Sequence, residues 1–207
     1  PDWVEITEIA DPYRGAYGYD DPDAGEKYAV DIDRAIAALN ARGQSLAGFI
    51  AESFPSVGGQ IEPPAGYLAG VYERIRAAGG LCIADEVQTG LGRLGHAFWG
   101  FETQDALPDM VVLGKPVGSG HPVGVVITTE DIAASFANGM EFFSTFGGTT
   151  LACEIGAEVL SIVDDEGLQQ NAHLQGQLLH DGLRQLQQRH MLIGDVRGRG
   201  LFLGVEL

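Results

Sequence analysis

The chain has 207 residues, of which 45% are hydrophobic and 20% are charged, a composition typical of a globular protein with a core of its own. Twelve basic and 29 acidic residues give a formal net charge of −17. A surface this acidic repels nucleic-acid phosphates and anionic lipids, and no apolar run reaches the roughly 20 residues that span a bilayer, so we expect neither nucleic acid nor a membrane as partner.

Hydrophobic periodicity predicts an alternation of helices and strands. Residues 1–27 contain turn-rich acidic segments and are predicted to be irregular. In chain order, the pattern then predicts a helix at 28–41, a strand at 46–51, a helix at 66–78, strands at 81–84, 110–113 and 123–128, a helix from about 131, helices at 151–166 and 168–190, and strands at 193–198 and 201–205. The first strands are continuously apolar, which favours a parallel α/β sheet covered by helices on both faces.

Three charged residues stand where predicted strands end, namely Glu52, Asp85 and Lys115. Parallel sheets bind ligands beyond the carboxyl ends of their strands, so this coincidence predicts a functional site at that edge. Simpler interpretations remain open for each residue alone. Asp85 could cap the next turn, and Lys115 could hold its ammonium group in water at a loop edge.

Two adjacent acids, Asp85 and Glu86, follow the strand at 81–84. Neighbouring side chains on an extended chain point to opposite faces, so the pair is not expected to share a ligand. We expect one acid to face the site and the other to make structural hydrogen bonds.

Lysine occurs at only two positions, Lys27 and Lys115. Lys115 follows an apolar strand and a glycine, where its amine could form a Schiff base with a carbonyl group. Farther along, the hydroxyls and glycines of residues 144–148 precede a helix and could bind an anion such as phosphate, or simply cap that helix. The glycine patterns are too incomplete for a dinucleotide-binding fingerprint.

Cys82 and Cys153 are far apart, and neither they nor the five histidines show metal-ligand spacing, so we predict no metal site. The cysteines are interpreted as reduced side chains in a cytoplasmic protein. The chain does not begin with Met and stops at 204–207 in the middle of what looks like a strand, so we expect it to be the truncated central piece of a longer protein.

Three ordered motifs resemble those of class-III (ornithine/alanine–glyoxylate type) aminotransferases. Residues 83–93 (IADEVQTGLGR) are similar to the family signature, Gly114-Lys115 to its cofactor lysine, and 144–148 (STFGG) to its phosphate motif. The resemblance implies an α/β fold with the mostly parallel sheet of the fold-type I pyridoxal-phosphate enzymes. Residues 1–165 would belong to the large cofactor-binding domain, and 166–207 would form the linking helix and first strands of a small C-terminal α+β domain.

The resemblance also implies a role for each matching residue. Lys115 would hold pyridoxal 5'-phosphate as a Schiff base and move the substrate proton, and Asp85 would pair with the pyridine nitrogen. Gln88 would hydrogen-bond the phenolic oxygen of the cofactor, and Val87 would pack on its ring. Glu52 would lie near the substrate.

A second set of residues would act across a dimer. The resemblance implies a homodimer in which Thr145, with Ser144 beside it, reaches the cofactor phosphate of the partner's site. Thr149 and Thr150 follow the motif where the family usually has Asn-Pro. The family's upstream phosphate loop has no counterpart in the chain, so we expect the chain alone to be inactive.

The implied reaction is transfer of an amino group from an amine or amino acid to a 2-oxo acid. Residues 50–53, 58–60 and 63–67 most resemble the ethanolamine-phosphate phospho-lyase branch, so elimination of phosphate from a phosphoethanolamine-like substrate is the alternative. A third possibility is that the chain is a non-catalytic, truncated fragment. The sequence does not identify the amino donor or acceptor.

Overall fold

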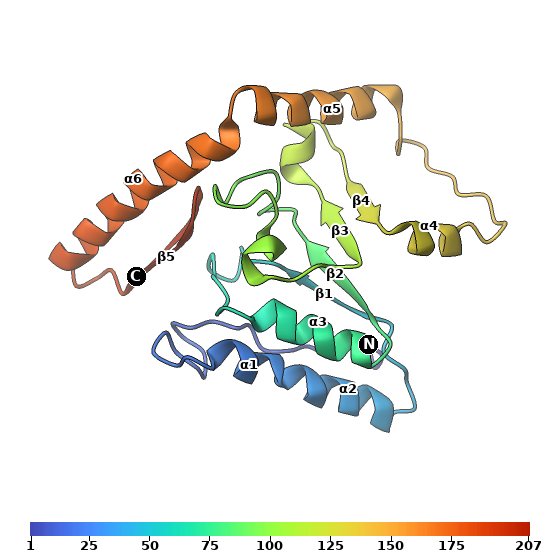
Figure 1. Cartoon of the computed structure of the whole chain (residues 1–207), viewed down its shortest axis with the longest axis horizontal. Helices are drawn as coiled ribbons and strands as arrows, with labels where there is room; N and C mark the ends of the chain where they lie inside the picture. Colours follow the sequence, from blue (N-terminus) through green and yellow to red (C-terminus); the bar gives the residue numbers. More distant parts are fainter.

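The computed structural model describes all residues from Pro1 to Leu207 and contains two β-sheets (Figure 1). The larger sheet has the strand order β1 (Gly48–Glu52), β2 (Leu81–Asp85), β3 (Met110–Leu113) and β4 (Val125–Thr128). The first three strands are parallel, and β4 runs antiparallel to β3. The smaller sheet is a hairpin of β5 (Asp195–Arg199) and β6 (Phe202–Glu206). The predicted α/β fold with a mostly parallel sheet is therefore confirmed.

Six α-helices and two short 3-10 helices connect these strands. The helices are α1 (Ala24–Ala29), α2 (Asp31–Ala41), α3 (Tyr67–Ala77), α4 (Glu130–Phe136), α5 (Thr150–Asp165) and α6 (Leu168–Arg189), and the 3-10 helices are η1 (Gly100–Gln104) and η2 (Lys115–Gly118). Most boundaries lie within a few residues of the predicted ones.

The prediction of a single helix at 28–41 was wrong at its start. The structure has two helices there, and α1 begins four residues earlier, within the segment predicted to be irregular. Gly25 accounts for the difference, because a Cβ at this position would lie 2.1 Å from the carbonyl oxygen of Ala65. A glycine in the first turn lowers helix propensity, but here it lets α1 approach the loop before α3 closely.

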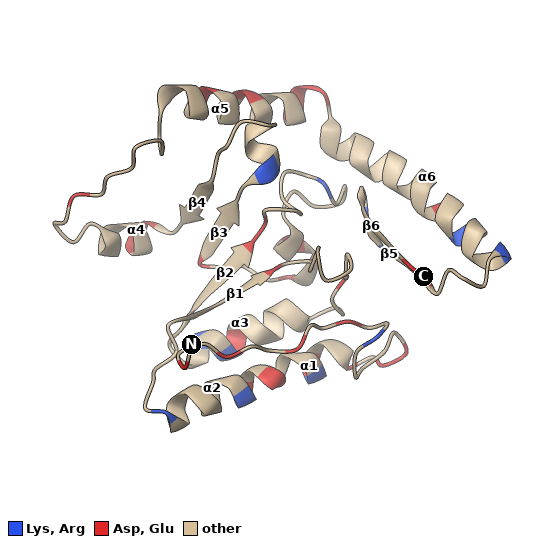
Figure 2. Cartoon of the chain, turned by 180° about the vertical axis from the view of Figure 1, so that it is seen from behind, with Lys and Arg blue, Asp and Glu red and all other residues tan.

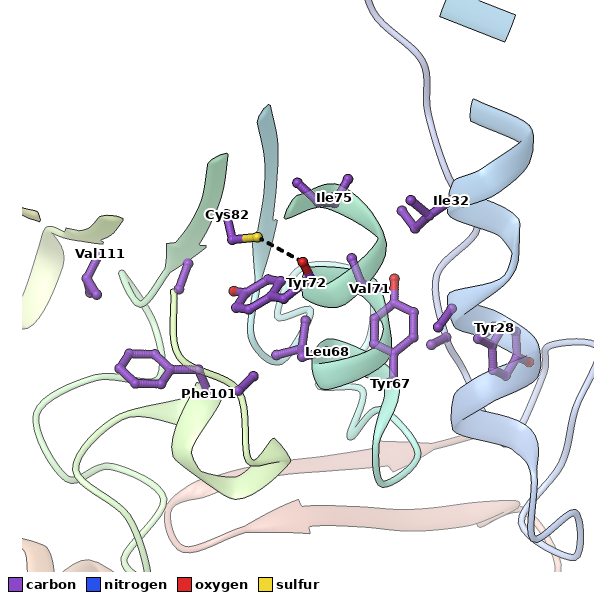
Figure 3. Packing of buried hydrophobic residues seen from close by; sticks show 14 of the residues in the cluster. Tyr28, Ile32, Tyr67, Leu68, Val71, Tyr72, Ile75, Cys82, Phe101 and Val111 are labelled. Atoms are coloured by element: carbon purple, nitrogen blue, oxygen red, sulfur yellow. Dashed lines mark hydrogen bonds between the residues drawn. The ribbon is translucent and has the colours of Figure 1, made fainter. Parts of the chain in front are cut away.

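Helix α3 packs against one face of the larger sheet, and α1 and α2 pack over α3 (Figures 1 and 3). The buried side chains that join these layers are Tyr28, Ile32, Leu68, Val71, Ile75, Cys82, Ala84 and Val111. Each large aliphatic side chain removed from water in this way contributes about 1.5–3 kcal/mol to folding. This cluster is the main core of the chain.

The opposite face of the larger sheet is open, so the expectation of helices on both faces was wrong for this chain. Ile50 and Ile83 are register partners on that face, as are Val112 and Val126 across the β3–β4 pair. Ile50 is 62% exposed and Val126 is 60% exposed. These strands carry apolar side chains on both faces of the sheet, but no helix of this chain covers the face opposite α3.

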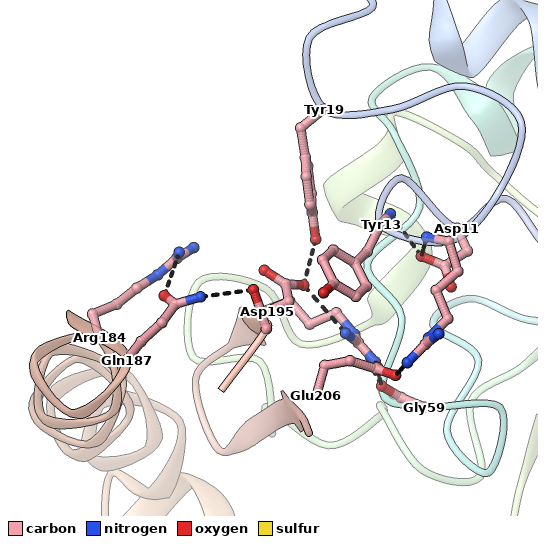
Figure 4. A network of polar contacts seen from close by, with 11 residues as sticks. Asp11, Tyr13, Tyr19, Gly59, Arg184, Gln187, Asp195 and Glu206 are labelled. Atoms are coloured by element: carbon pink, nitrogen blue, oxygen red, sulfur yellow. Dashed lines mark hydrogen bonds and ion pairs between the residues drawn. The ribbon is translucent and has the colours of Figure 1, made fainter. Parts of the chain in front are cut away.

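The β5–β6 hairpin is held to the rest of the chain by polar contacts of the buried Arg197 with Gly59, Asp195 and Glu206, three residues that Figure 4 labels. The guanidinium group of Arg197 is ion-paired with Asp195 and Glu206, and its Nε and Nη2 donate hydrogen bonds to the carbonyl oxygen of Gly59 at 3.0 and 2.7 Å. Tyr19 donates a hydrogen bond to Asp195 at 2.8 Å. Distant parts of the chain are thereby joined at one buried cation.

The predicted domain boundary at 165/166 falls between two helices. Helix α5 ends at Asp165, and α6 begins after Gly167, which has a left-handed backbone (φ 62°). Helix α6 then packs along β5 and β6. The division into 1–165 and 166–207 stays a prediction, since α6 also contacts α5.

Acidic residues are spread over several helices and loops instead of gathering on one face (Figure 2). None of the helices is both long enough and apolar enough to cross a membrane.

Replacing a core leucine tests the packing described above. Leu68 is 1% exposed within the main core, so Leu68→Ala is expected to lower the free energy of unfolding by about 2–5 kcal/mol, since it leaves a cavity. Leu178→Ala on α6 is the matched control, because Leu178 is 70% exposed and its loss should change stability by less than about 0.5 kcal/mol. Equal losses for both variants in urea unfolding would contradict the assigned core.

Candidate active site

The carboxyl ends of β1, β2 and β3 bring three of the predicted residues to one edge of the larger sheet. Glu52 and Asp85 are register partners at the last positions of β1 and β2. Asp85 also pairs in register with Val112, and Lys115 follows three residues later, after β3 has ended. The predicted meeting of these charged residues at the carboxyl edge therefore agrees with the strand register.

Asp85 lies on the open side of the sheet, and its position in the strand explains this orientation. It shares a face with Ile83, two residues earlier in the strand, whereas Cys82 and Ala84 face the core. The Asp85 side chain is half-buried, and its Oδ1 accepts a hydrogen bond from the backbone N–H of Val87 at 2.9 Å. This bond shapes the turn that follows β2 and leaves the other carboxyl oxygen without a partner in the chain.

Val87 brings this turn against the end of β3. A Cβ at Gly114 would lie 3.4 Å from Cγ1 of Val87, so the turn after β2 and the residue before Lys115 are in close contact. Val87 and Gln88 are both half-buried. Lys115 begins η2 with an exposed side chain that makes no hydrogen bond or ion pair within the chain. Two adjoining turns, the one after β2 and the one after β3, therefore carry four chemically different groups. These are the carboxyl group of Asp85, the apolar side chain of Val87, the amide of Gln88 and the unpaired amine of Lys115.

Glu86 points the other way and is completely buried. Its carboxyl group accepts four hydrogen bonds, from the hydroxyls of Ser53 and Thr89 and from the backbone N–H groups of Gly100 and Phe101. Burial raises the pKa of Glu86 above its usual value, and these four donors offset part of that rise. The expectation that one of the two adjacent acids makes structural hydrogen bonds fits Glu86.

Glu52 is engaged by its own loop. Its Oε2 accepts hydrogen bonds from the backbone N–H of Ser56 at 3.0 Å and from the hydroxyl of the same residue. Its carboxyl group therefore helps to shape the loop after β1 while remaining at the carboxyl edge of the sheet.

Ser144 and Thr145 are not brought to this edge. They lie in the exposed connection between α4 and α5, which extends away from the larger sheet (Figure 1). The Ser144 hydroxyl accepts a hydrogen bond from the N–H of Gly147 at 2.9 Å. The hydroxyl of Thr149 caps α5 by accepting a bond from Ala152, so the Thr-Thr pair supports an ordinary helix start. Their action in a partner's site stays a prediction.

Sequence reasoning missed Ser53, Thr89 and Gly100, the residues that surround Glu86. Alternation along β2 places Glu86 on the same side as Ala84 and opposite Asp85, but it does not say which of the two sides is buried. The donors that satisfy it come from three separate segments, and nothing in the local pattern links those segments. Only the tertiary contacts identify them.

Gly100 offers a direct test of this buried cluster. A Cβ at Gly100 would lie 2.8 Å from Cβ of Ser53 and 3.0 Å from both Oε1 of Glu86 and Oγ1 of Thr89. We expect Gly100→Ala to lower the free energy of unfolding by about 1–3 kcal/mol through overpacking. The control is Gly182→Ala in α6, where a Cβ meets nothing within 4 Å and should raise stability by roughly 0.5–1 kcal/mol. If Gly100→Ala were also stabilising in urea unfolding, the tight packing around Glu86 would be contradicted.

The raised pKa of Glu86 predicts a pH dependence of stability. An unfolded glutamate releases its proton near a pKa of about 4.3, so between that value and the raised pKa the folded chain holds a proton that the unfolded chain has lost. The contribution of Glu86 to stability should therefore fall as pH rises through this window. Urea unfolding from about pH 4.5 to 8 should show a steeper decline for the wild-type chain than for Glu86→Gln. Parallel curves would contradict this expectation.

The amino-acid sequence is similar to that of known proteins over nearly its whole length. The family model described as aminotransferase class-III matches residues 9–207. An alanine--glyoxylate aminotransferase 2-like protein of Drosophila melanogaster is 48% identical over 100% of this chain and 43% of its own length. The ethanolamine-phosphate phospho-lyase homolog 1 of Caenorhabditis elegans is 38% identical over 100% of this chain and 47% of its own length. The chain therefore spans less than half the length of these relatives.

Solved structures show the same fold. A phospholyase from Arthrobacter in complex with phosphoethanolamine superimposes with a TM-score of 0.90 and 40% identity, over 98% of this chain and 48% of the other. A taurine:2-oxoglutarate aminotransferase from Bifidobacterium kashiwanohense, in complex with PLP and glutamate, gives a TM-score of 0.84 and 29% identity, over 94% of this chain and 44% of the other. With the family model matching nearly the whole chain and both named branches among its relatives, this chain belongs to the class-III aminotransferase family.

Proposed function

We propose that this chain carries the cofactor lysine of a pyridoxal-phosphate enzyme that transfers an amino group from an amine or amino acid to a 2-oxo acid. The observation that carries the proposal is the placement of Asp85 and Lys115 at neighbouring carboxyl ends of β2 and β3, in a chain of the class-III family. Asp85 lies in the segment 83–93 that is similar to the family signature, and Lys115 corresponds to the cofactor lysine of the family.

The residues at this edge fit the proposed cofactor chemically. A free primary amine at Lys115 suits a carbonyl group, and the unpartnered carboxyl oxygen of Asp85 suits a protonated pyridine nitrogen. The Gln88 amide can donate to a phenolic oxygen, and Val87 offers an apolar surface beside Gly114. When bound, pyridoxal phosphate would supply a ring that withdraws electrons from the bond broken in the substrate.

The chain's own residues then have separate tasks. Lys115 would hold the cofactor through Nζ, and once the amine of the substrate has replaced Nζ there, the released lysine amine would take the substrate proton and return it. Asp85 would keep a proton on the pyridine nitrogen through the negative charge of its carboxyl group. Glu52 stands at the substrate side, with Ser56 fixing its orientation. These roles are proposals carried over from the family motifs.

We extend the proposal to the assembly. Residues 137–149 are exposed throughout and include Met140, Phe142, Phe143 and Phe146, apolar side chains that favour burial against another surface. A second copy of the protein is the proposed partner, with Ser144 and Thr145 reaching its cofactor phosphate.

Elimination of phosphate from a phosphoethanolamine-like substrate is the second candidate function. It is favoured by the TM-score of 0.90 with the Arthrobacter phospholyase, which was solved with phosphoethanolamine. The two reactions differ in whether a leaving group stands on the carbon adjacent to the one that bears the amine. Assays for 2-oxo acid consumption and for phosphate release, run side by side on the protein that contains this chain, separate them.

Chemical trapping tests the proposed cofactor site. The chain is mixed with pyridoxal phosphate and reduced with borohydride, and the labelled peptide is mapped. We expect selective labelling of Lys115, because Lys27, the other lysine, is bound to both carboxyl oxygens of Asp21 at 2.8 and 2.6 Å. Lys115→Ala should abolish the label, and Lys27→Ala, the matched control, should keep it. Labelling of Lys27 alone, or none at Lys115, would contradict the proposal.

A further inference from the structure

The turn after β2 has a backbone shape that its own sequence does not favour. Leu91 is buried yet adopts a left-handed conformation with φ 62°, which residues other than glycine rarely adopt. At Gly90, a Cβ would lie 2.9 Å from the carbonyl oxygen of Glu86. Such a turn persists only where tertiary contacts hold it. We call residues 85–92 the site turn, since it carries Asp85, Val87 and Gln88.

Glu86 supplies those tertiary contacts. Its carboxyl group receives one hydrogen bond from inside the site turn, from the Thr89 hydroxyl at 2.6 Å. The other three come from outside the turn, from Ser53 after β1 and from the N–H groups of Gly100 and Phe101 at 2.8 and 3.0 Å. The group is fully buried, so water cannot replace a donor that is lost.

The backbone around Glu86 is fixed as well. Its N–H donates to the carbonyl oxygen of Val112 on β3 at 2.9 Å, and its carbonyl oxygen accepts from Gly90 at 3.0 Å. Both the main chain and the side chain of Glu86 are therefore held between β1, β3 and η1. Because Asp85 is the residue immediately before Glu86, these hydrogen bonds also restrict the backbone conformation of Asp85.

We propose that Glu86 is a positioning residue, which fixes the site turn through its buried carboxyl group. It thereby holds the Asp85 carboxyl group, which strand alternation directs to the open side of the sheet, in its hydrogen bond with the N–H of Val87. Glu86 does not touch the proposed cofactor position, because its side chain lies on the core side. The role of Asp85 toward the cofactor rests on the proposed function, but the hydrogen bond that holds its side chain can be measured without any cofactor.

The backbone N–H of Val87 is the reporter, because it donates to Oδ1 of Asp85. Thr89→Val removes one donor to Glu86 while keeping the side-chain shape, and Thr89→Ser retains the hydroxyl. Glu102→Gln is the matched control. The Glu102 carboxyl group also accepts hydrogen bonds from two backbone N–H groups, those of Phe98 and Trp99, but Glu102 is exposed and makes no hydrogen bond to the site turn.

Hydrogen exchange of ¹⁵N-labelled chain by NMR gives the readout. In Thr89→Val, the Val87 amide is expected to exchange about tenfold faster relative to the amides of α3, the factor for one lost hydrogen bond. Thr89→Ser and Glu102→Gln should leave that ratio unchanged. If Thr89→Val does not fold, Ser53→Ala removes a different donor and carries the same expectation.

A general loss of protection in Thr89→Val, with the ratio of Val87 to α3 unchanged, would mean that Glu86 only stabilises the fold and would overturn the proposal. Borohydride trapping on the same variants separates this from the proposed function. Absence of label at Lys115 in the wild-type chain would contradict the cofactor site, and the exchange ratio would still decide the role of Glu86.

Discussion

Side chains on an extended strand point alternately to its two faces, and this constraint governs the arrangement at the end of β2. Cys82, Ala84 and Glu86 fall on the side covered by α3, while Ile83 and Asp85 fall on the open side. A buried carboxyl group is costly unless it is hydrogen-bonded, so the position of Glu86 demands partners. The four donors that meet this demand draw the end of β1, the site turn and η1 together.

The loop after β1 is fixed by two buried polar groups. Glu86 accepts a hydrogen bond from Ser53 at the start of this loop, and Arg197 donates to the carbonyl oxygen of Gly59 farther along it. The apolar contact beside the β5–β6 hairpin is small, a cluster of Phe54, Leu94 and Phe202. Polar bonds in a dry environment therefore define the geometry at the carboxyl edge, while the large apolar core under α3 provides the stability.

Sequence pattern located most elements, because apolar spacing follows directly from which face of a helix or strand is buried. It misjudged the start of α1, where Gly25 weakens the local signal but allows a close approach to Ala65. It also predicted a sheet buried on both faces, because apolar strands indicate that a face can be buried and do not say what covers it. The exposure of Ile50 and Val126 corrects that expectation.

The sequence by itself determined the family motifs, the order of helices and strands, and the appearance of Glu52, Asp85 and Lys115 at strand ends, since each of these is a local property of the chain. It also determined that Asp85 and Glu86 face opposite ways. Only the tertiary structure decided which of the two is buried, which strands are neighbours, and that Ser53, Thr89 and Gly100 surround Glu86. These depend on contacts between segments far apart in the chain, and local spacing carries no information about which distant donors will satisfy a buried group.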